Sequence, residues 1–341
     1  KEFTMKCTIQ NIADHLGLSR NTVSKALKNS SEVSENTRNL VIKTASKLGY
    51  KKATFATPVI PASETGSNGT ILFLTRTYAS DSEFWTTVLR GIESILSNAN
   101  YHLAISIMSD SDLKQLNFPQ TISDSSIKGI ILVEICDKVV CDALSQFNLP
   151  IVSVDMPNVP FEELNGIDVV TMESKKNLKK IINQLIEKGA ESFGFVGDLY
   201  SPNVSRGFQE RYNALSECLA EHQLPLNQKN CLLHQTPEDF RNFQTTVNNL
   251  QAMISLPDVF ICGNDWTAIQ LIYALQFLGF QIPKDICVVG FDNIPAASRI
   301  SPSLTTISTP QKYLGIAAAR QILERIQHPN CPHVFCQYET E

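Results

Sequence analysis

The sequence predicts an all-α helix-turn-helix headpiece followed by a larger α/β domain of two lobes. Apolar residues recur at helical spacing between residues 8 and 48. From residue 70 onward, short runs rich in β-branched residues alternate with helical stretches, as is typical of parallel α/β folds. We therefore expect a headpiece over residues 5–50, a linker over 51–69 and a two-lobed domain over 70–341.

Length and composition are those of an ordinary globular chain with two or three domains. The 341 residues are 43% hydrophobic and 18% charged. No apolar stretch approaches the roughly 20 residues that a membrane helix needs, and no apolar run follows the N-terminus as in a secretory signal. The nine cysteines include no CxxC pair. We therefore expect reduced thiols in a cytoplasmic protein that has no membrane partner.

Charge is distributed unevenly along the chain. Taken alone, the formal net charge of −5 disfavours a nucleic-acid partner. Residues 1–52, however, hold ten Lys and Arg residues and four acidic ones, a net +6, whereas the remainder carries −11. A small basic head on a large acidic body suggests that the head meets a polyanion.

The headpiece is predicted to contain three helices. Thr8 is the candidate N-cap of the first helix, and Gly17 supplies the positive φ of the turn that follows. Ser19 is placed to cap the second helix. Ser34 is placed to cap the third, which Gly49 ends.

Polar side chains cover the expected outer face of the second helix. Arg and Lys can donate to guanine, Asn can pair with adenine, and Ser or Thr hydroxyls suit phosphate contacts. The alternative is a solvated face on a three-helix bundle, but the spacing and the local charge favour DNA binding. The candidate contacts on and before this helix are Thr8, Ser19, Arg20, Asn21, Thr22, Ser24, Lys25 and Lys28.

A known headpiece shares this pattern. Residues 8–13 (TIQNIA), 17–27 (GLSRNTVSKAL), 33–38 (VSENTR) and 48–50 (LGY) resemble the headpiece of the lactose/galactose repressor (LacI/GalR) family. The resemblance implies which candidates read bases, namely Arg20, Asn21 and Lys25, and which hold phosphates, namely Thr8, Ser19, Thr22 and Ser24.

The linker departs from that family. There, a short hinge helix follows the headpiece and inserts a leucine into the minor groove. Here Val59 stands at the leucine position and Pro58 precedes it, and a proline inside a helix costs about 3 kcal/mol. The hinge helix is therefore in doubt. Either the headpiece is joined to the body more loosely than in the family, or Phe55 or Val59 takes the place of the leucine that inserts into the minor groove.

The body is predicted to be two doubly wound halves. No G-x-G-x-x-G or Walker sequence follows a strand, and neither G-x-S-x-G nor H-E-x-x-H occurs, which removes the usual nucleotide-enzyme, hydrolase and metalloprotease classes. The candidate strands are residues 70–75, 102–106, 129–133, 151–155, 168–171, 192–196, 231–233, 259–262 and 286–291.

The family resemblance continues through the body. It is carried by residues 84–93, 129–132, 150–155, 185–189, 259–265, 285–293 and 303–307. It implies the type I periplasmic-binding-protein-like fold, with an effector in the cleft between two hinged lobes. We expect one lobe to hold about 70–165 plus 311–327, and the other about 166–307 plus 328–341.

Polar residues at the carboxyl ends of the strands are the candidates for a ligand site, because open α/β sheets bind ligands there. A sugar needs hydrogen-bond partners for its hydroxyls and an aromatic face for its apolar side. The resemblance implies an aromatic wall, an effector arginine and a polar clamp. The candidate residues are Phe84, Trp85, Arg211, Asn264, Asp265, Trp266 and Asp292.

Each of these assignments has a structural alternative. Asp292 can serve only to cap a turn, Phe84 and Trp85 can be core residues, and Arg211 can be a surface charge. Glu173-Ser174 also stands where the family usually shows Asp-Asn. The resemblance therefore does not assign the residues of that wall of the cleft, nor the ligand.

A metal site and catalysis are the remaining alternatives. His328, Cys331, His333 and Cys336 are four soft ligands within nine residues. In a strand, however, His333 and Cys336 point to opposite faces, so we expect no metal and no cofactor. An enzyme that uses the cleft carboxylates Asp155 and Asp292 is a third alternative, but no catalytic signature accompanies them, so we expect no enzyme.

The sequence as a whole predicts a DNA-binding transcription regulator, expected to be a repressor. It is expected to act as a homodimer on a pseudo-palindromic operator, because two heads double the contacts of one. No heptad repeat closes the chain, which favours a dimer over a tetramer. The expected effector is small and polar, a sugar or sugar derivative. The alternative function is a solute-binding protein, which explains the body but not the head.

Overall fold

The computed structural model describes residues 8–27, 33–47, 67–76, 82–199, 204–234 and 242–341. The chain divides into two compact units, Lys1–Gly66 and Ser67–Glu341, and each is described by itself. The predicted hinge segment around Pro58 and Val59, the helix stop at Gly49 and the side chain of Lys28 lie outside the described residues.

The first unit contains the three predicted helices, α1 (Ile9–Leu16), α2 (Arg20–Leu27) and α3 (Glu35–Lys47). Thr8 caps α1 in a capping box with Asn11, and Gly17 takes the left-handed conformation at φ 64°. Ser19 Oγ accepts a hydrogen bond from the Thr22 amide at 3.0 Å, so it caps α2. The small core contains Ile12, Ala13, Val23, Ala26, Val33, Val41 and Ala45.

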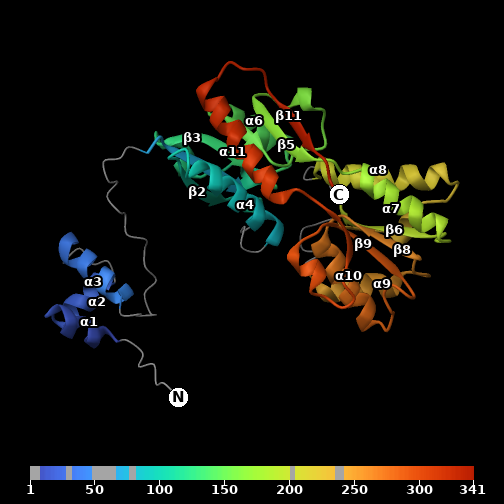
Figure 1. Ribbon diagram of the computed structural model, residues 1–341, viewed down its shortest axis with the longest axis horizontal. Coiled ribbons are helices and arrows are strands. Elements are labelled where there is room, and N and C mark those ends of the chain that lie inside the picture. The colour runs from blue at the N-terminus through green and yellow to red at the C-terminus, as the bar shows by residue number, and fades with distance from the viewer. Residues whose placement is uncertain (1–7, 28–32, 48–66, 77–81, 200–203, 235–241) are drawn as a thin grey trace. The chain divides into compact units, whose positions relative to one another are not determined.

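The second unit is built on two parallel sheets (Figure 1). The six-stranded sheet has the order β11-β5-β4-β3-β1-β2, and the five-stranded sheet has the order β10-β9-β8-β6-β7. The strands of the first sheet are β1 (Thr70–Thr75), β2 (His102–Ile107), β3 (Ile127–Leu132), β4 (Ile151–Ser153), β5 (Ile167–Met172) and β11 (Phe335–Tyr338). Those of the second are β6 (Phe193–Asp198), β7 (Leu232–His234), β8 (Val259–Cys262), β9 (Cys287–Asp292) and β10 (Thr305–Ser308).

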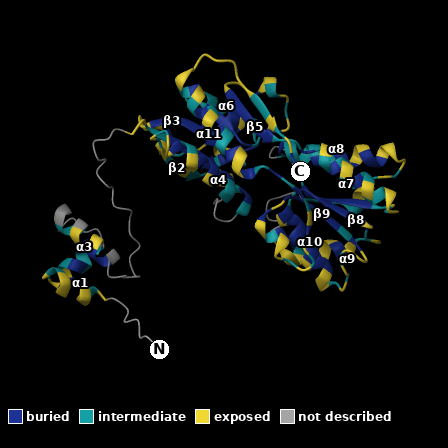
Figure 2. Ribbon diagram, viewed as in Figure 1, coloured by how far each residue is buried: buried dark blue, intermediate teal, exposed yellow. Residues whose placement is uncertain are grey.

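Helices cover both faces of each sheet, which is why the central strands are apolar on both sides (Figure 2). Alternate residues of β1 show this, since Ile71 and Phe73 join one buried cluster and Leu72 and Leu74 another. The helices are α4 (Glu83–Leu96), α5 (Asp110–Gln115), α6 (Lys138–Ser145), α7 (Lys176–Glu187), α8 (Arg206–Glu221), α9 (Phe243–Ala252), α10 (Asp265–Phe277) and α11 (Gln311–Gln327), with short 3-10 turns between them. No helix in the described part of the chain has both the length and the apolarity to cross a bilayer.

Two strands lie in a different lobe from the one expected. The sequence-based boundaries gave residues 166–172 and 328–341 to the second lobe. Instead, β5 pairs with β4, Ile167 opposite Ile151, and β11 pairs with β5, Phe335 opposite Val169. Strand pairing depends on contacts between distant segments, so the position of a segment along the chain did not reveal it.

The chain crosses between the lobes three times, after β5, after β10 and after β11. After the last crossing, the backbone of Glu341 exchanges two hydrogen bonds with Ser308 at the edge of the second sheet. These two bonds join the segment that follows β11, in the first sheet, to the carboxyl end of β10, in the second sheet.

Two glycines let α4 and α11 pack at close range. A Cβ atom on Gly315 would lie 2.0 Å from the Val88 carbonyl oxygen, and one on Gly91 would lie 2.3 Å from the Lys312 carbonyl oxygen. We expect Gly315→Ala to lower the free energy of unfolding by about 1–3 kcal/mol, because the helices must separate. Urea denaturation measures this, with the exposed Arg320→Ala on the same helix as control. Equal stability of the two variants would contradict the prediction.

Candidate functional site

The predicted DNA-reading face lies on α2 of the first unit. Arg20 and Asn21 are exposed, Thr22, Ser24 and Lys25 are partly buried, and Val23 and Ala26 fill the core on the other side. This arrangement places the polar candidates together on one side of the helix. The face therefore presents hydrogen-bond donors and acceptors on a helix that is packed against the headpiece core.

The N-termini of α1 and α2 carry no acidic residue in their first turns. The hydroxyls predicted to hold phosphates, those of Thr8 and Ser19, are the caps of these two helices. A helix N-terminus with free amide groups and no carboxylate attracts an anion. The first unit thus offers two such positions beside its basic residues.

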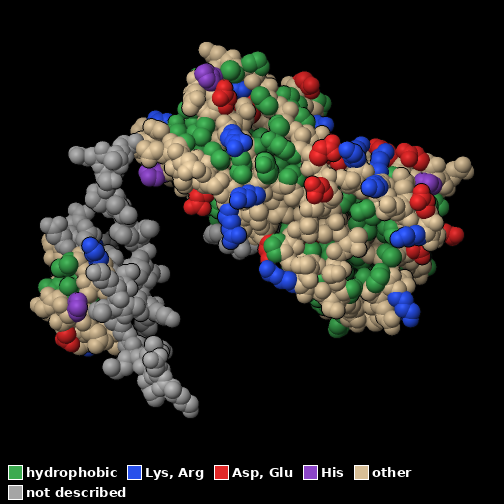
Figure 3. Space-filling view, viewed as in Figure 1, with side chains coloured by type: hydrophobic (Ala, Val, Ile, Leu, Met, Phe, Trp, Pro, Cys, Tyr) green, Lys and Arg blue, Asp and Glu red, His purple; other side chains and the backbone are tan. Residues whose placement is uncertain are grey.

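The charges of the second unit are arranged differently. In the view of Figure 3, its Lys and Arg side chains are scattered among acidic ones. On α7 and α8 they form surface ion pairs, such as Lys175 with Glu217 at 2.9 Å and Lys179 with Glu217 at 2.7 Å. Exposed pairs of this kind add little stability, but they leave this face without an extended basic patch.

Arg211 is the centre of the second candidate site. Only 3% of its surface is exposed, which removes the alternative of a surface charge. Its Nη1 donates to the Gly263 carbonyl oxygen at 2.5 Å, and its guanidinium lies 3.8 Å from the centre of the Phe291 ring. Its Nε has no hydrogen-bond partner among the described residues. A buried donor without a partner is costly, so it indicates a place for a ligand.

Two carboxyl groups from different lobes act electrostatically on this guanidinium. Burial raises the pKa of Asp292 well above its usual range, and attraction to Arg211 offsets this only in part. Burial also raises the pKa of Asp155 to about 6, against the opposing effects of the Met156 amide and Arg211. Burial in turn lowers the pKa of Arg211, although Asp292 and Asp155 favour its charged form. Perturbed groups of this kind cluster at functional sites.

Asp292 also has a strained backbone. It ends β9 with φ at 126°, a conformation that side chains other than glycine rarely adopt. Its carbonyl oxygen accepts bonds from Thr309 Oγ1 at 2.9 Å and Gln311 Nε2 at 2.7 Å, both at the crossover into α11. These bonds hold the strained geometry. The carboxyl group also interacts electrostatically with Arg211, so its role is not limited to capping a turn.

The aromatic pair lies at the start of α4. Phe84 is buried, while Trp85 is partly exposed, and the two rings meet edge to face at 4.6 Å. Trp85 Nε1 donates to Glu134 Oε1 at 2.5 Å. Glu134 follows β3 and has φ at 57°, in the left-handed region. Sequence reasoning missed Glu134, although its place directly after a buried strand could have indicated it.

The three candidates at the start of α10 have other contacts. Asn264 caps the helix, accepting from the Thr267 amide at 2.9 Å. Asp265 is fully buried and accepts from the Ile294 amide at 2.9 Å and from Thr306 Oγ1. It therefore holds α10 against the segment after β9 and against β10. Trp266 is 37% exposed.

Ser174 adds a buried hydroxyl beside Arg211. Ser174 is 1% exposed and its Oγ has no hydrogen-bond partner among the described residues. A Cβ atom on Gly207 would lie 3.4 Å from both Ser174 Oγ and Arg211 Nη2, so the two side chains flank the same glycine. Ser153, which ends β4, also has a buried hydroxyl without a partner in the described chain. The departure from the family at Ser174 thus falls beside Arg211.

The candidate metal cluster is not assembled in the described residues, which contain no group of three or more His, Cys, Asp or Glu able to hold an ion. His333 Nδ1 instead lies 3.3 Å from Asp168 Oδ1, and Cys331 is exposed.

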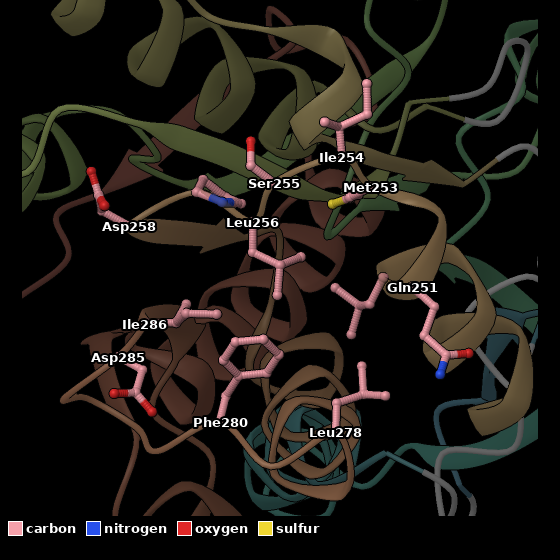
Figure 4. Close-up of a pocket in the computed structure, with 12 residues that line it drawn as sticks. Gln251, Met253, Ile254, Ser255, Leu256, Asp258, Leu278, Phe280, Asp285 and Ile286 are labelled. Atoms are coloured by element: carbon pink, nitrogen blue, oxygen red, sulfur yellow. The ribbon is translucent and has the colours of Figure 1, made fainter.

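A cavity of about 480 Å³ lies elsewhere, between the end of α9 and the end of α10 (Figure 4). Asp258 and Ile286, which line it, precede β8 and β9. The cavity is therefore at the amino-terminal edge of the second sheet, whereas Arg211 and Asp292 meet at the carboxyl edge.

The raised pKa of Asp155 predicts a pH-dependent stability. A carboxyl whose folded pKa exceeds its unfolded pKa stabilises the protein at low pH, and that contribution is lost as pH rises through about 6. We expect Asp155→Asn to melt about 2–4 °C above the unsubstituted protein at pH 8, with the difference vanishing below about pH 4. Thermal melts across this range test it, with the exposed Glu162→Gln as control. A difference in melting temperature between Asp155→Asn and the unsubstituted protein that stays the same at every pH would contradict the prediction.

Two family models match the chain. One, "Bacterial regulatory proteins, lacI family", matches residues 8–52, and the other, "Periplasmic binding protein-like domain", matches residues 182–335. The ribose operon repressor of Haemophilus influenzae is 27% identical over 95% of this chain and 93% of its own length.

Solved structures share the fold. The transcriptional regulator CelR–cellobiose complex has a TM-score of 0.68 at 19% identity and covers 98% of each chain. The lac repressor dimer bound to operator and the anti-inducer ONPF has a TM-score of 0.66 at 18% identity and covers 99% of this chain and 97% of its own. The predicted fold class, a helix-turn-helix headpiece with a periplasmic-binding-protein-like domain, is confirmed.

Proposed function

The chain belongs to the LacI family of bacterial regulatory proteins, and from this premise we propose that it is a transcriptional repressor whose operator affinity is controlled by a sugar. The observation that carries the proposal is the combination, in one chain, of a lacI-family DNA-binding domain at residues 8–52 and a periplasmic-binding-protein-like domain at residues 182–335. A solute-binding protein is not favoured, because it leaves the headpiece without a role.

The headpiece binds operator DNA through α2. Arg20 and Asn21 are exposed on that helix and are proposed to read base edges in the major groove, with Lys25. The N-termini of α1 and α2, capped by Thr8 and Ser19, are proposed to meet the phosphates, together with Thr22 and Ser24. The protein acts as a homodimer, as the lac repressor does on its operator. A bacterial DNA-binding regulator works beside the chromosome, so we place it in the cytoplasm.

Substitutions on α2 test the DNA-reading face. We expect Arg20→Ala and Asn21→Ala each to weaken operator binding by about 10–100-fold, because each removes a base contact worth about 1–3 kcal/mol. Lys43→Ala on α3 removes a positive charge from an exposed position and serves as the control. Gel retardation with a pseudo-palindromic operator measures the affinities. Full operator affinity in both α2 variants would refute the assignment.

The effector site is proposed to be the Arg211 cluster at the carboxyl edges of the two sheets. The Haemophilus relative is named for a ribose operon, and the similar CelR structure is a complex with cellobiose, which supports a sugar effector here. Arg211, Asp155 and Asp292 supply hydrogen-bond partners for hydroxyl groups, and Phe84 and Trp85 an aromatic face.

Effector binding reaches the headpieces through the lobes. Asp292 and Arg211 belong to the second lobe, whereas Asp155 and the aromatic pair belong to the first. A ligand held by both sets favours one relative pose of the lobes and shifts the heads of the dimer relative to the operator half-sites. The coupling needs only about 1–3 kcal/mol.

Operator binding with and without sugars tests the whole proposal. We expect the full chain to retard operator DNA, and at least one sugar to change the retarded fraction. A chain that does not retard DNA at low salt would overturn the proposal. The relatives described above are transcription regulators, which are not enzymes, and we assign no catalytic step to Asp155 and Asp292.

A further inference from the structure

Trp85 lies at the start of α4, where the two lobes meet. Two residues earlier, Glu83 Oε2 accepts a hydrogen bond from the Ala296 amide at 2.8 Å, and Ala296 follows β9 in the second lobe. The Trp85 amide donates to the oxygen of Ser82, the cap of α4, at 3.2 Å. The backbone of Trp85 is therefore fixed at the first turn of a helix whose start is bonded to the opposite lobe.

The Trp85 ring is held as well as its backbone. It meets the ring of the buried Phe84 edge to face, and its Nε1 donates to Glu134 Oε1 at 2.5 Å. A tryptophan side chain turns about only two dihedral angles, so a contact at the ring and a bond at Nε1 fix the plane of the indole. The side chain stays partly exposed and can still contact a ligand.

The neighbours of Glu134 impose its backbone conformation. Its φ of 57° lies in the left-handed region, which side chains such as glutamate rarely adopt. Just before it, the Val133 amide donates to the Leu74 carbonyl oxygen at 3.0 Å. Three residues after it, Asp137 caps α6 through the Val139 amide at 2.9 Å. A left-handed turn between these fixed points brings the glutamate side chain to α4, and such over-determined conformations cluster at ligand sites.

Glu134 leaves the same edge of the sheet as Asp155. Strands β3 and β4 are parallel neighbours with Leu132 opposite Ser153, and the two acidic residues each follow two positions later. Burial is the main cause that raises the pKa of Asp155, and the charge of Glu134 adds to it. The residue that bonds Trp85 therefore lies beside the candidate effector site.

The bond to Glu134 decides what the Trp85 ring can offer a ligand. Indole Nε1 is the one polar group of the side chain and can only donate. Because Glu134 accepts that proton, the ring presents its aromatic surface rather than a hydrogen-bond donor. A ring that is already held in place also loses less conformational freedom when a ligand packs against it.

We propose that Glu134 is a positioning residue of the effector site, whose carboxylate holds the Trp85 indole in the orientation that packs against the effector. The inference rests on the proposed function, since it assigns a role within the same regulatory site. Glu134 acts through Trp85 and is not itself a ligand contact. The structural alternative is that the bond only fastens α4 to the end of β3. That alternative predicts a loss of stability without a Trp85-dependent change in effector affinity.

The indole N–H resonance tests the bond without any ligand. The full chain holds two tryptophans, so labelling them for NMR gives two indole signals, and Trp85→Phe assigns that of Trp85. We expect Glu134→Ala to shift this signal and to speed its exchange with water by about 10-fold or more, because a hydrogen bond to a charged acceptor is lost. Glu134→Gln retains an acceptor oxygen and should keep most of the protection. The exposed Glu162→Gln is the control.

A double-variant cycle separates positioning from a structural role. Calorimetry with D-ribose and with cellobiose gives the affinities, and thermal melts give the stabilities. We expect a sugar to bind Glu134→Ala about 3–10-fold more weakly than the unsubstituted protein, because the freed ring must be ordered on binding. Glu134→Gln should restore the affinity to within about 2-fold. In a Trp85→Ala background, Glu134→Ala should change the affinity by less than about 2-fold.

Four results would overturn the inference. They are an unchanged Trp85 signal in Glu134→Ala, full sugar affinity in that variant, the same loss of affinity in the Trp85→Ala background, and a Trp85 signal in the unsubstituted protein that neither sugar moves. Operator retardation on the same preparations separates this inference from the proposed function. A sugar that changes retardation without moving the Trp85 signal leaves the repressor function standing, whereas a chain that does not retard operator loses that function itself.

Discussion

Arg211→Ala is expected to abolish the response to the effector while operator binding persists. Among the described residues, Arg211 is the cation that acts electrostatically on both Asp155 and Asp292, which belong to different lobes. Without it, both carboxyls remain buried and become protonated, and the ligand loses a charged donor, whose hydrogen bonds contribute about 1.5–3 kcal/mol each. With two such bonds, effector affinity falls by about 100-fold or more. Operator affinity without effector should stay within about 3-fold, because the headpiece is untouched.

Arg211→Lys is expected to lose the response to the effector as well. A lysine cannot cover the Phe291 ring as a flat guanidinium does, and it has no second nitrogen to reach a ligand while it binds the Gly263 carbonyl oxygen. Calorimetry gives the effector affinity and gel retardation the operator affinity. The exposed Arg90→Ala on α4 is the control, with no expected change in either. Retention of the full effector response by Arg211→Ala would move the site elsewhere in the chain.

Asp168→Ala is expected to cause the largest loss of stability. Asp168 lies fully buried on β5 and accepts from Arg325 Nε at 3.0 Å and Nη2 at 2.8 Å. The bonds from Arg325, Val334 and Gln321 lower its pKa, although burial alone would raise it. Removal of the carboxylate leaves a buried guanidinium without its counter-ion, which costs about 3–5 kcal/mol.

The Asp168 pair also connects distant segments. Arg325 lies near the end of α11 and donates to the carbonyl oxygens of Cys331 and Pro332, in the loop that leads to β11. Urea denaturation of Asp168→Ala, Arg325→Met and the double variant measures the coupling, and we expect the double variant to lose less than the sum of the single ones. Asp142→Ala, which breaks a partly exposed pair with Lys138 at 2.6 Å, should cost under about 1 kcal/mol. Similar losses for Asp142→Ala and Asp168→Ala would refute the argument.

Much of the local structure could be predicted from the sequence. The caps at Thr8 and Ser19 and the left-handed turn at Gly17 lie where the residue types required them. The strand expected at residues 70–75 is β1, Thr70–Thr75. Strand β10 was not among the expected strands, and the final strand was expected only as the alternative to a metal site around His333 and Cys336. Both strands are only four residues long, and so short a run carries little periodicity.

The candidate site was predicted less completely. Strand-end position and family resemblance named Arg211, Asp292 and the cleft carboxylate Asp155, but could not show how deeply these groups are buried or how they shift one another's pKa. Asp265 was named for the same reason as Asp292, yet its carboxylate bonds the Ile294 amide and Thr306 Oγ1. Two strand ends can therefore look alike in sequence although the carboxylate at one of them is bonded to other parts of the fold.

The sequence by itself determined which segments become helices and strands, the uneven charge of head and body, and the family. These properties depend on residues close together along the chain, through backbone periodicity, caps and turn chemistry. Only the tertiary structure decided that β5 and β11 join the first sheet and that Asp155, Arg211 and Asp292 converge. Both depend on contacts between residues far apart in the chain, where pairing, burial and desolvation decide which groups meet and how strongly they are charged.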